Sequence, residues 1–382
     1  MTPNTTKPTI AVLFGGRSGE HEVSIESSRS VFSVLDPEKY TILPVGIDHS
    51  GVWWTGDGIH DCLAAREQPS TERFQQVTFL NQPGDRTLYA INGGRLSAAA
   101  SIDVVFPVLH GTFGEDGTLQ GYLEMIGVAY VGAGVLGSST GMDKAVFKDI
   151  MRANNIPVVP SITLTRKEIR QELDTILTQA IEEFGFPIFT KPANMGSSVG
   201  ISKCSGGSDL LEGVMEAARY DRRILIEKGV DAREIEISVL GNEFPKASLP
   251  GEIVPCDVFY SYDAKYVDDN SELIIPAPIS QELTEELRDV AVRAYKAIDS
   301  AGMARVDFLL DKKTGEYFLN EVNTIPGFTK ISMYPKLWEA TGLSYASLVD
   351  ELIQLACDRR NEQDQTIYIY DGKSFNQKDK VS

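Results

Sequence analysis

The sequence has few cysteines and histidines and no long apolar run, and each absence excludes a class of protein. Its four cysteines are far apart among 382 residues and form no CxxC pair. This spacing argues against a disulfide framework or a zinc site and favours reduced thiols in a cytoplasmic protein. The four histidines form no HExxH motif. No segment approaches a membrane span or the apolar core of a signal peptide.

The sequence also lacks any strongly basic segment. Its formal net charge is −18, from 54 acidic and 36 basic residues. This balance argues against nucleic acid or an anionic membrane as a partner. An acidic protein that handles phosphates must therefore gather its few cations at one place. The composition is that of a globular protein, and 382 residues predict two or three domains.

Strand and helix patterns alternate along the chain and predict an α/β fold. Residues 9–47 read as strand, helix and strand, and more strands are expected at 102–109 and 129–132. This order predicts a parallel sheet with ligands at the carboxyl ends of its strands. Residues 57–95 read as a polar insertion or a strand pair, and the Gly/Ser-rich residues 134–141 suggest a boundary. The predicted division is an N-terminal α/β substrate domain (1–138), a central α+β domain (139–222), a C-terminal domain (223–360) and a polar tail (361–382).

The most informative pattern is a predicted hairpin formed by RVD (305–307) and EVN (321–323) around a polar turn. Its register sets Asp307 opposite Glu321. It also sets Arg305 opposite Asn323. Because like charges repel across a sheet, a cation is expected between the two carboxylates, and an oxygen set of this kind suits Mg²⁺. The alternative is a pair of solvated surface carboxylates. The other face of the hairpin is predicted to be core: Val306, Phe308, Leu310, Phe318 and Val322.

Two strand-end loops predict ligand contacts. The loop KPANMGSSVG (191–200) offers amides and hydroxyls that suit a phosphate, with Lys191 at its base. It is not a Walker A loop, and a flexible turn is the alternative. In GGRSGEHE (15–22), Glu20 either caps a helix or holds a substrate ammonium. His110, at the end of another strand, is either structural or a ligand residue.

Two further segments fit a nucleotide and a lid. The strand ILIEK ends at Glu227 and Lys228, where backbone groups suit an adenine, and Glu234 suits a ribose. Surface charges are the alternative reading of these residues. The loop FYSYDAKY (259–266) is rich in aromatic residues, as lids often are.

Taken together, these segments resemble those of the D-alanine–D-alanine ligases of the ATP-grasp superfamily. The matching segments occur in order between residues 10 and 355: GGRSGEHEVS, LHGTFGEDGTLQG, MDK, KPANMGSSVGIS, EK, FYSYDAKY, RVDF and NEVNTIPGFTKISM. The resemblance implies a three-domain ATP-grasp architecture. It also implies ATP-dependent synthesis of D-alanyl-D-alanine through a D-alanyl phosphate, for peptidoglycan.

The resemblance implies roles for residues at the amino-acid end of the site. Glu20 would hold the ammonium of the first D-alanine and form a linking triad with Ser197 and Tyr266. Arg305 and the amide of Gly327 would form an oxyanion site, in which fixed donors face developing charge. The remaining substrate-binding residues implied are His110, Ser332 and Met333.

The resemblance also implies a nucleotide and metal end. Lys144, Lys191 and Lys265 would bind phosphates. Magnesium or manganese, as two ions, would be held by Asp307, Glu321 and Asn323. The other nucleotide-binding residues implied are Ser198, Glu227, Lys228, Val230, Glu234, Phe259 and Asn320.

Two alternatives remain beside this function. Some relatives make D-alanyl-D-lactate or D-alanyl-D-serine; Tyr266 favours the dipeptide, whereas Met333 stands where many relatives have leucine. A non-catalytic nucleotide- or amino-acid-binding regulator is the other alternative, and no expected lysine or metal carboxylate is missing to favour it. The resemblance further implies a cytoplasmic homodimer with D-alanine and ATP as partners.

Overall fold

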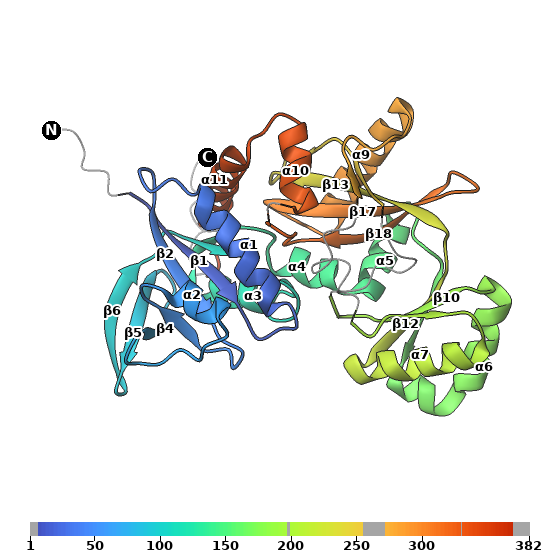
Figure 1. The fold of residues 1–382 in the computed structure, drawn as a ribbon, viewed down its shortest axis with the longest axis horizontal. Helices are drawn as coiled ribbons and strands as arrows, with labels where there is room; N and C mark the ends of the chain where they lie inside the picture. Colours follow the sequence, from blue (N-terminus) through green and yellow to red (C-terminus); the bar gives the residue numbers. More distant parts are fainter. Residues whose placement is uncertain (1–6, 197–198, 255–271, 330, 370–382) are drawn as a thin grey trace, which may run out of the picture.

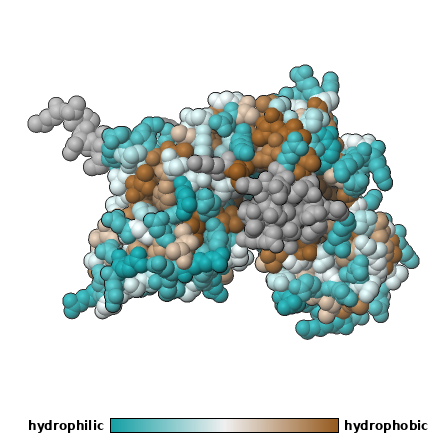
Figure 2. All heavy atoms as spheres, viewed as in Figure 1, coloured by the Kyte–Doolittle hydropathy of each residue, from teal (hydrophilic) through white to brown (hydrophobic). Residues whose placement is uncertain are grey.

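The computed structural model describes residues 7–196, 199–254, 272–329 and 331–369. Three sheets define three units, and Figure 1 shows them around a common centre, with the N-terminal unit at the left, the central unit at the lower right and the C-terminal unit above it. No helix among the described residues is long and apolar enough to cross a bilayer. Figure 2 shows hydrophilic side chains over much of the visible face, as the charged composition leads one to expect.

The N-terminal unit contains an eight-stranded mixed sheet in the order β6-β5-β4-β3-β2-β1-β7-β8. The parallel prediction is confirmed for one half of the sheet, which consists of β1 (Thr9–Gly15), β2 (Thr41–Ile47), β7 (Val104–Pro107) and β8 (Ala129–Tyr130). The other strands are antiparallel: β3 (Trp53–Thr55), β4 (Gln75–Phe79), β5 (Thr87–Asn92) and β6 (Arg95–Ser101). Residues 57–95, which were predicted to be an insertion or a strand pair, thus extend the sheet. Val77, Phe79 and Leu88 from this segment are buried in the core of the N-terminal unit. Its helices are α1 (His21–Val34), α2 (Ile59–Ala64) and α3 (Thr118–Ile126).

The central unit is a four-stranded antiparallel sheet covered on one face by two helices. Its strands, in order, are β11 (Ser202–Cys204), β10 (Ile188–Pro192), β12 (Arg223–Lys228) and β9 (Ser161–Thr165). The helices α6 (Arg166–Phe184) and α7 (Gly207–Tyr220) bury apolar side chains against Ile188 and Ile226. Because β12 pairs with both β10 and β9, the predicted division at 222/223 is wrong: it would separate this strand from its sheet.

The C-terminal unit contains the sheet β16-β15-β13-β17-β18, with β14 paired to β13. Its elements are β13 (Ala232–Leu240), β14 (Lys246–Ala247), β15 (Gly251–Val254), β16 (Glu272–Ile274), α9 (Gln281–Ala297), β17 (Met303–Asp311), β18 (Tyr317–Asn323) and α10 (Met333–Ala340). One face of the sheet packs on α9 in an apolar core. The opposite face presents the polar side chains of β13, β17 and β18 to the cleft.

The Gly/Ser-rich stretch predicted as a boundary is instead the helix α4 (Val135–Met142). A Cβ on Gly137 would lie 2.8 Å from the carbonyl oxygen of Asp299, so small residues let α4 pack closely on the C-terminal unit. The next helix, α5 (Lys144–Ala153), buries Phe147 and Met151 in the core of the same unit. The division at 138/139 therefore falls inside α4, and we propose a central unit of residues 161–228.

The last helix, α11 (Tyr345–Gln363), packs against the N-terminal sheet. Leu348 and Leu352 are fully buried in one core with Ile10 and Val104. Figure 1 shows this red helix beside the blue N-terminal elements. The helix extends past residue 361, where the polar tail was predicted to begin, and the C-terminal region thereby joins the two outer units.

Candidate active site

One cleft of about 1800 Å³ lies among the three units, and sixteen predicted site residues line it. They are Glu20, His110, Lys144, Lys191, Glu227, Lys228, Val230, Glu234, Arg305, Asp307, Asn320, Glu321, Asn323, Gly327, Ser332 and Met333. The other five predicted residues, Ser197, Ser198, Phe259, Lys265 and Tyr266, lie outside the described residues.

The predicted hairpin register is confirmed. Asp307 lies opposite Glu321. Arg305 lies opposite Asn323. A bulge in β18 at Asn320 then shifts the pairing, so that Phe308 is opposite Leu319. The prediction that Phe318 belongs to the core is therefore wrong: Leu319 is fully buried and Phe318 is half-buried.

Three carboxylates lie side by side across the cleft face of the C-terminal sheet. Glu236 in β13 is opposite Asp307, which is opposite Glu321. The guanidinium of Arg305 lies among them and donates to both oxygens of Asp307, at 2.8 and 2.7 Å. Its Nε is also 3.0 Å from Glu236 Oε2. The expected positive charge on this face is thus supplied partly by Arg305 itself. Sequence reasoning did not assign Glu236 a role, although it shares a strand face with Glu234.

The predicted metal ligands adjoin this arginine. The amide nitrogen of Asn323 donates to Oδ2 of Asp307 at 2.9 Å, so these two side chains are in contact. Within the described parts of the chain, no three His, Cys, Asp or Glu side chains form a group that could hold a metal. The predicted set does not require three such residues, because it combines two carboxylates with an amide oxygen, all hard oxygen donors.

Two predicted phosphate-binding lysines reach the cleft from different elements. Lys144 begins α5, and its Nζ donates to the carbonyl of Met195 at 2.7 Å. Lys191 ends up beside Glu227 because β10 and β12 are neighbours, and its Nζ is 2.6 Å from Glu227 Oε2. Burial lowers the pKa of Lys191, but the charge and hydrogen bond of Glu227 outweigh it and the pKa is raised overall. Lys191 is therefore a cation at the cleft wall.

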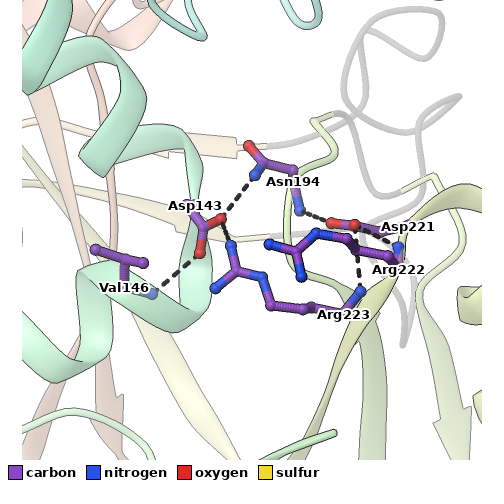
Figure 3. Close-up of polar contacts among 6 residues, drawn as sticks. All are labelled: Asp143, Val146, Asn194, Asp221, Arg222 and Arg223. Atoms are coloured by element: carbon purple, nitrogen blue, oxygen red, sulfur yellow. Dashed lines mark hydrogen bonds and ion pairs between the residues drawn. The ribbon is translucent and has the colours of Figure 1, made fainter. Parts of the chain in front are cut away.

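A polar cluster fixes the base of the loop that follows β10 (Figure 3). Asp143 caps α5 by accepting from the amide of Val146 at 3.0 Å. Its other oxygen accepts from Asn194 Nδ2 at 2.7 Å and from the guanidinium of Arg223. The amide of Asn194 donates to Asp221 Oδ2 at 2.8 Å. Asp143 thus connects the start of α5, which carries Lys144, to the loop after β10 and to β12.

At the amino-acid end, loops from two units converge on the Glu20 carboxylate. A Cβ on Gly111 would overlap Glu20 Oε2, and one on Gly196 would lie 2.9 Å from it, so both glycines permit close approach. Nearby, Glu115 accepts from the amide of Gly111 at 2.8 Å. Burial, together with the charge of Glu20, raises the pKa of Glu115 to about 8. Glu115 lines the cleft and was not predicted, although it lies in the GEDG segment.

His110 connects three elements at the cleft wall. Its Nδ1 is 3.2 Å from the carbonyl oxygen of Ile325, and its Nε2 is 3.1 Å from Ser27 Oγ. Since a carbonyl only accepts, we assign the proton to Nδ1, and Nε2 accepts from the serine hydroxyl. Burial lowers the pKa of His110, in agreement with a neutral ring. Both nitrogens are therefore engaged by protein groups.

The loop after β18 brings Gly327 against Ser332, the N-cap residue of α10. A Cβ on Gly327 would lie 2.8 Å from Ser332 Oγ. The hydroxyl of Ser332 accepts from the amide of Thr329 at 3.0 Å. A side chain at position 327 would displace this hydroxyl, so the glycine is a requirement of the loop's shape.

Comparison with known families gives two matches that together span most of the chain. Residues 9–133 match the model of the D-ala D-ala ligase N-terminus, and residues 150–354 match that of the D-ala D-ala ligase C-terminus. Among curated proteins, the D-alanine–D-alanine ligase of Heliobacterium modesticaldum is 47% identical over 357 residues, covering 94% of this chain and 96% of the relative. That of Thermoanaerobacter sp. strain X514 is 50% identical over 368 residues, covering 94% and 98%.

Solved structures give the same likeness. The D-alanine-D-alanine ligase from Coxiella burnetii superposes with a TM-score of 0.79 at 38% identity, covering 94% of this chain and 98% of that one. The VanG D-Ala:D-Ser ligase from Enterococcus faecalis gives a TM-score of 0.81 at 33% identity, covering 92% and 100%.

Proposed function

The chain belongs to the D-alanine–D-alanine ligase family, an ATP-grasp family, and from this membership we propose how its cleft residues carry out the reaction. It is an ATP-dependent ligase that joins two D-alanines. The observation that supports the site assignment is the convergence of the described predicted residues on one cleft.

At the nucleotide end, Lys144 and Lys191 bind phosphates of ATP. The strand end at Glu227 and Lys228 receives the adenine, and Glu234 receives the ribose. In an acidic protein these cations are the local attraction for a polyanion. Since Lys144 and Lys191 are hydrogen-bonded or ion-paired within the protein, ATP binding exchanges these contacts for phosphate contacts.

Asp307, Glu321 and Asn323 would hold Mg²⁺ or Mn²⁺. The fit rests on donor chemistry, because two carboxylates and one amide on the paired strands β17 and β18 offer hard oxygen ligands at the cleft. Such an ion neutralises charge on transferring phosphate oxygens. Asp307 would have to share its oxygens between Arg305 and the ion, and each carboxylate oxygen has the lone pairs for this.

At the amino-acid end, Glu20 holds the ammonium of the first D-alanine. A carboxylate oxygen of that D-alanine attacks the γ-phosphorus, the bond to the β-γ bridging oxygen breaks, and ADP leaves. The amine of the second D-alanine, oriented through its carboxylate by Ser332, then attacks the acyl carbon. The amine loses a proton, inorganic phosphate leaves, and Arg305 with the amide of Gly327 stabilises the transient oxyanion. His110 holds the loop that carries Gly327 in place.

We propose a cytoplasmic location and a homodimer as further properties. Three cysteines among the described residues carry free thiols, which supports a reducing compartment. Sedimentation equilibrium of the full chain tests the dimer, and a monomer at micromolar concentration would contradict it.

The function is tested by assaying ADP and phosphate release from ATP, and by mass spectrometry of the products. Release is expected only with D-alanine and Mg²⁺ together, and D-alanyl-D-alanine is expected to predominate when D-lactate or D-serine competes. Predominant mixed products would overturn the dipeptide assignment, and ATP that stays intact under all conditions would overturn the ligase reading.

A further inference from the structure

A buried lysine outside the predicted site lies behind the nucleotide end of the cleft. Lys148, on α5, is 2% exposed and does not line the cleft. Its Nζ is 3.0 Å from Glu227 Oε1 and donates to the carbonyl of Val159 at 3.2 Å. Burying an ammonium group destabilises the fold unless the charge is paired, so the ion pair with Glu227 is what allows Lys148 to be buried.

Glu227 is shared between two lysines. Its Oε2 is 2.6 Å from Lys191 Nζ, while its Oε1 faces Lys148. The side chain of Lys191 is 14% exposed and lines the cleft, whereas that of Glu227 is 3% exposed. The three charges therefore run in a row from the core of the protein to the cleft wall. Lys148 occupies the inner end of this row and Lys191 the outer end.

The row holds two lysines and one carboxylate; burial lowers the pKa of the Lys148 ammonium, and the charge and hydrogen bond of Glu227 oppose this shift. Burial raises the pKa of the Glu227 carboxyl, but the charges and hydrogen bonds of Lys148 and Lys191 outweigh burial and bring the pKa to about 2. This carboxylate is therefore ionised. With Lys148 in place, the negative charge of Glu227 is already balanced. Without Lys148, Lys191 would be the sole counterion of Glu227 in this row, and a phosphate approaching it would meet a neutral pair instead of a net positive charge.

We propose that Lys148 is a positioning residue for nucleotide binding: it neutralises Glu227 and leaves the ammonium of Lys191 to bind a phosphate of ATP. The inference rests on the proposed function only for the role of Lys191. Lys148 acts through Glu227 and touches no substrate.

The test is a double-mutant cycle read out by the Kd for Mg·AMPPNP and by steady-state kinetics. Lys148→Met is expected to raise this Kd and the KM for ATP by about ten-fold or more, while the KM for D-alanine stays within about two-fold. In the Glu227→Gln background, where no carboxylate needs balancing, Lys148→Met is expected to change the Kd by less than about three-fold. Lys296→Met, an exposed lysine on α9, is the control for removing one charge and is expected to change neither value.

An unchanged Kd in Lys148→Met, or a ten-fold loss that persists in the Glu227→Gln background, would overturn the proposal. If Lys148→Met does not fold, as judged by thermal melting, the double variant is compared with Glu227→Gln, because neither contains an unpaired buried carboxylate. Lys191→Met distinguishes the proposed role of Lys191 from that of Lys148. If it leaves ATP affinity intact, the phosphate role of Lys191 fails; if it weakens ATP and Lys148→Met does not, only the role of Lys148 fails.

Discussion

At the scale of single residues, the site keeps its charges in internal ion pairs. Arg305 holds Asp307, and Lys191 holds Glu227. These side chains are largely buried, and such burial is tolerated because each charge is compensated. In the proposed function, ATP and its cation would bind by exchanging partners with these residues, so the same residues would serve the free and the bound states.

Asp307 is the residue at which this exchange is most sharply tested. Asp307→Asn is expected to lower kcat/KM for Mg·ATP by about 100-fold or more, because a hard cation loses a carboxylate ligand. The free energy of unfolding is expected to change by no more than about 2 kcal/mol, because Arg305 keeps Glu236 as a partner. Steady-state kinetics and urea unfolding check both values. Asp289→Asn, at an exposed position on α9, is the control, and turnover within three-fold of wild type in Asp307→Asn would contradict the ligand role.

His110 predicts a pH dependence of stability. Its pKa in the folded chain lies below the ordinary value of 6.5, chiefly because of burial. As the pH falls, the imidazole is therefore protonated in the unfolded chain before it is protonated in the folded chain. Stability is therefore lost as the pH falls below 6.5, by at most about 1.4 kcal/mol per pH unit. Urea unfolding between pH 7.5 and 5.5 is expected to show a smaller loss in His110→Gln than in wild type. Equal losses in the two proteins would count against this assignment.

At the scale of elements, the position of Lys144 in the site depends on the contacts between the start of α5 and the loop that follows β10. Asp143 caps α5 and binds Asn194 and Arg223 (Figure 3). In addition, the amide of Lys144 donates to the carbonyl of Ala193 at 2.9 Å. The position of Lys144 is thus coupled to the loop that follows β10. The bulge in β18 has a similar role, since it turns Asn320 toward the cleft while Leu319 stays in the core.

Asn194→Ala tests this coupling. Removal of its side-chain hydrogen bond to Asp143 is expected to raise the KM for ATP by about three- to ten-fold, with a loss of about 1 kcal/mol in stability. Asn154→Ala is the matched control. Asn154 is an exposed asparagine at the end of α5, and its side chain also makes one hydrogen bond, to the carbonyl oxygen of Ile150. Equal kinetics in the two variants would show that the loop base does not position Lys144.

At the scale of the whole molecule, residues from all three units line one cleft. Glu20 comes from the N-terminal unit, Lys191 from the central unit, and Asp307 from the C-terminal unit. Helix α11 returns to the N-terminal sheet and buries Leu348 and Leu352 there, which joins the two outer units through an apolar core. None of the described residues of the central unit belongs to this core.

Nucleotide binding is therefore expected to stabilise the assembled molecule. Mg·AMPPNP at about 100 times its Kd adds about 2.7 kcal/mol to the folded state, which predicts a rise of roughly 3 °C in the melting temperature. Differential scanning fluorimetry measures this shift. Lys191→Met at the same nucleotide concentration is expected to show a smaller rise, and an equal rise would argue against this lysine as a phosphate contact.

The sequence by itself determined the features that are set by local spacing. Strand alternation fixed the opposition of Asp307 and Glu321, and the strand, helix and strand pattern of residues 9–47 predicted the parallel pairing of β1 with β2. Family resemblance, carried by short motifs in order, identified the function. These inferences hold because each depends on neighbouring residues or on a fixed order along the chain.

Only the tertiary structure decided the features that depend on distant contacts. Helix α4 forms from a Gly/Ser-rich segment because its small residues fit against Asp299 and Ser300, which lie over 150 positions away. The β18 bulge exchanges Leu319 for Phe318 in the core, and β12 joins the central sheet through partners on both sides. The pairing of Lys148 with Glu227 likewise has no signal in either local sequence, because burial and charge compensation arise only when α5 and β12 meet.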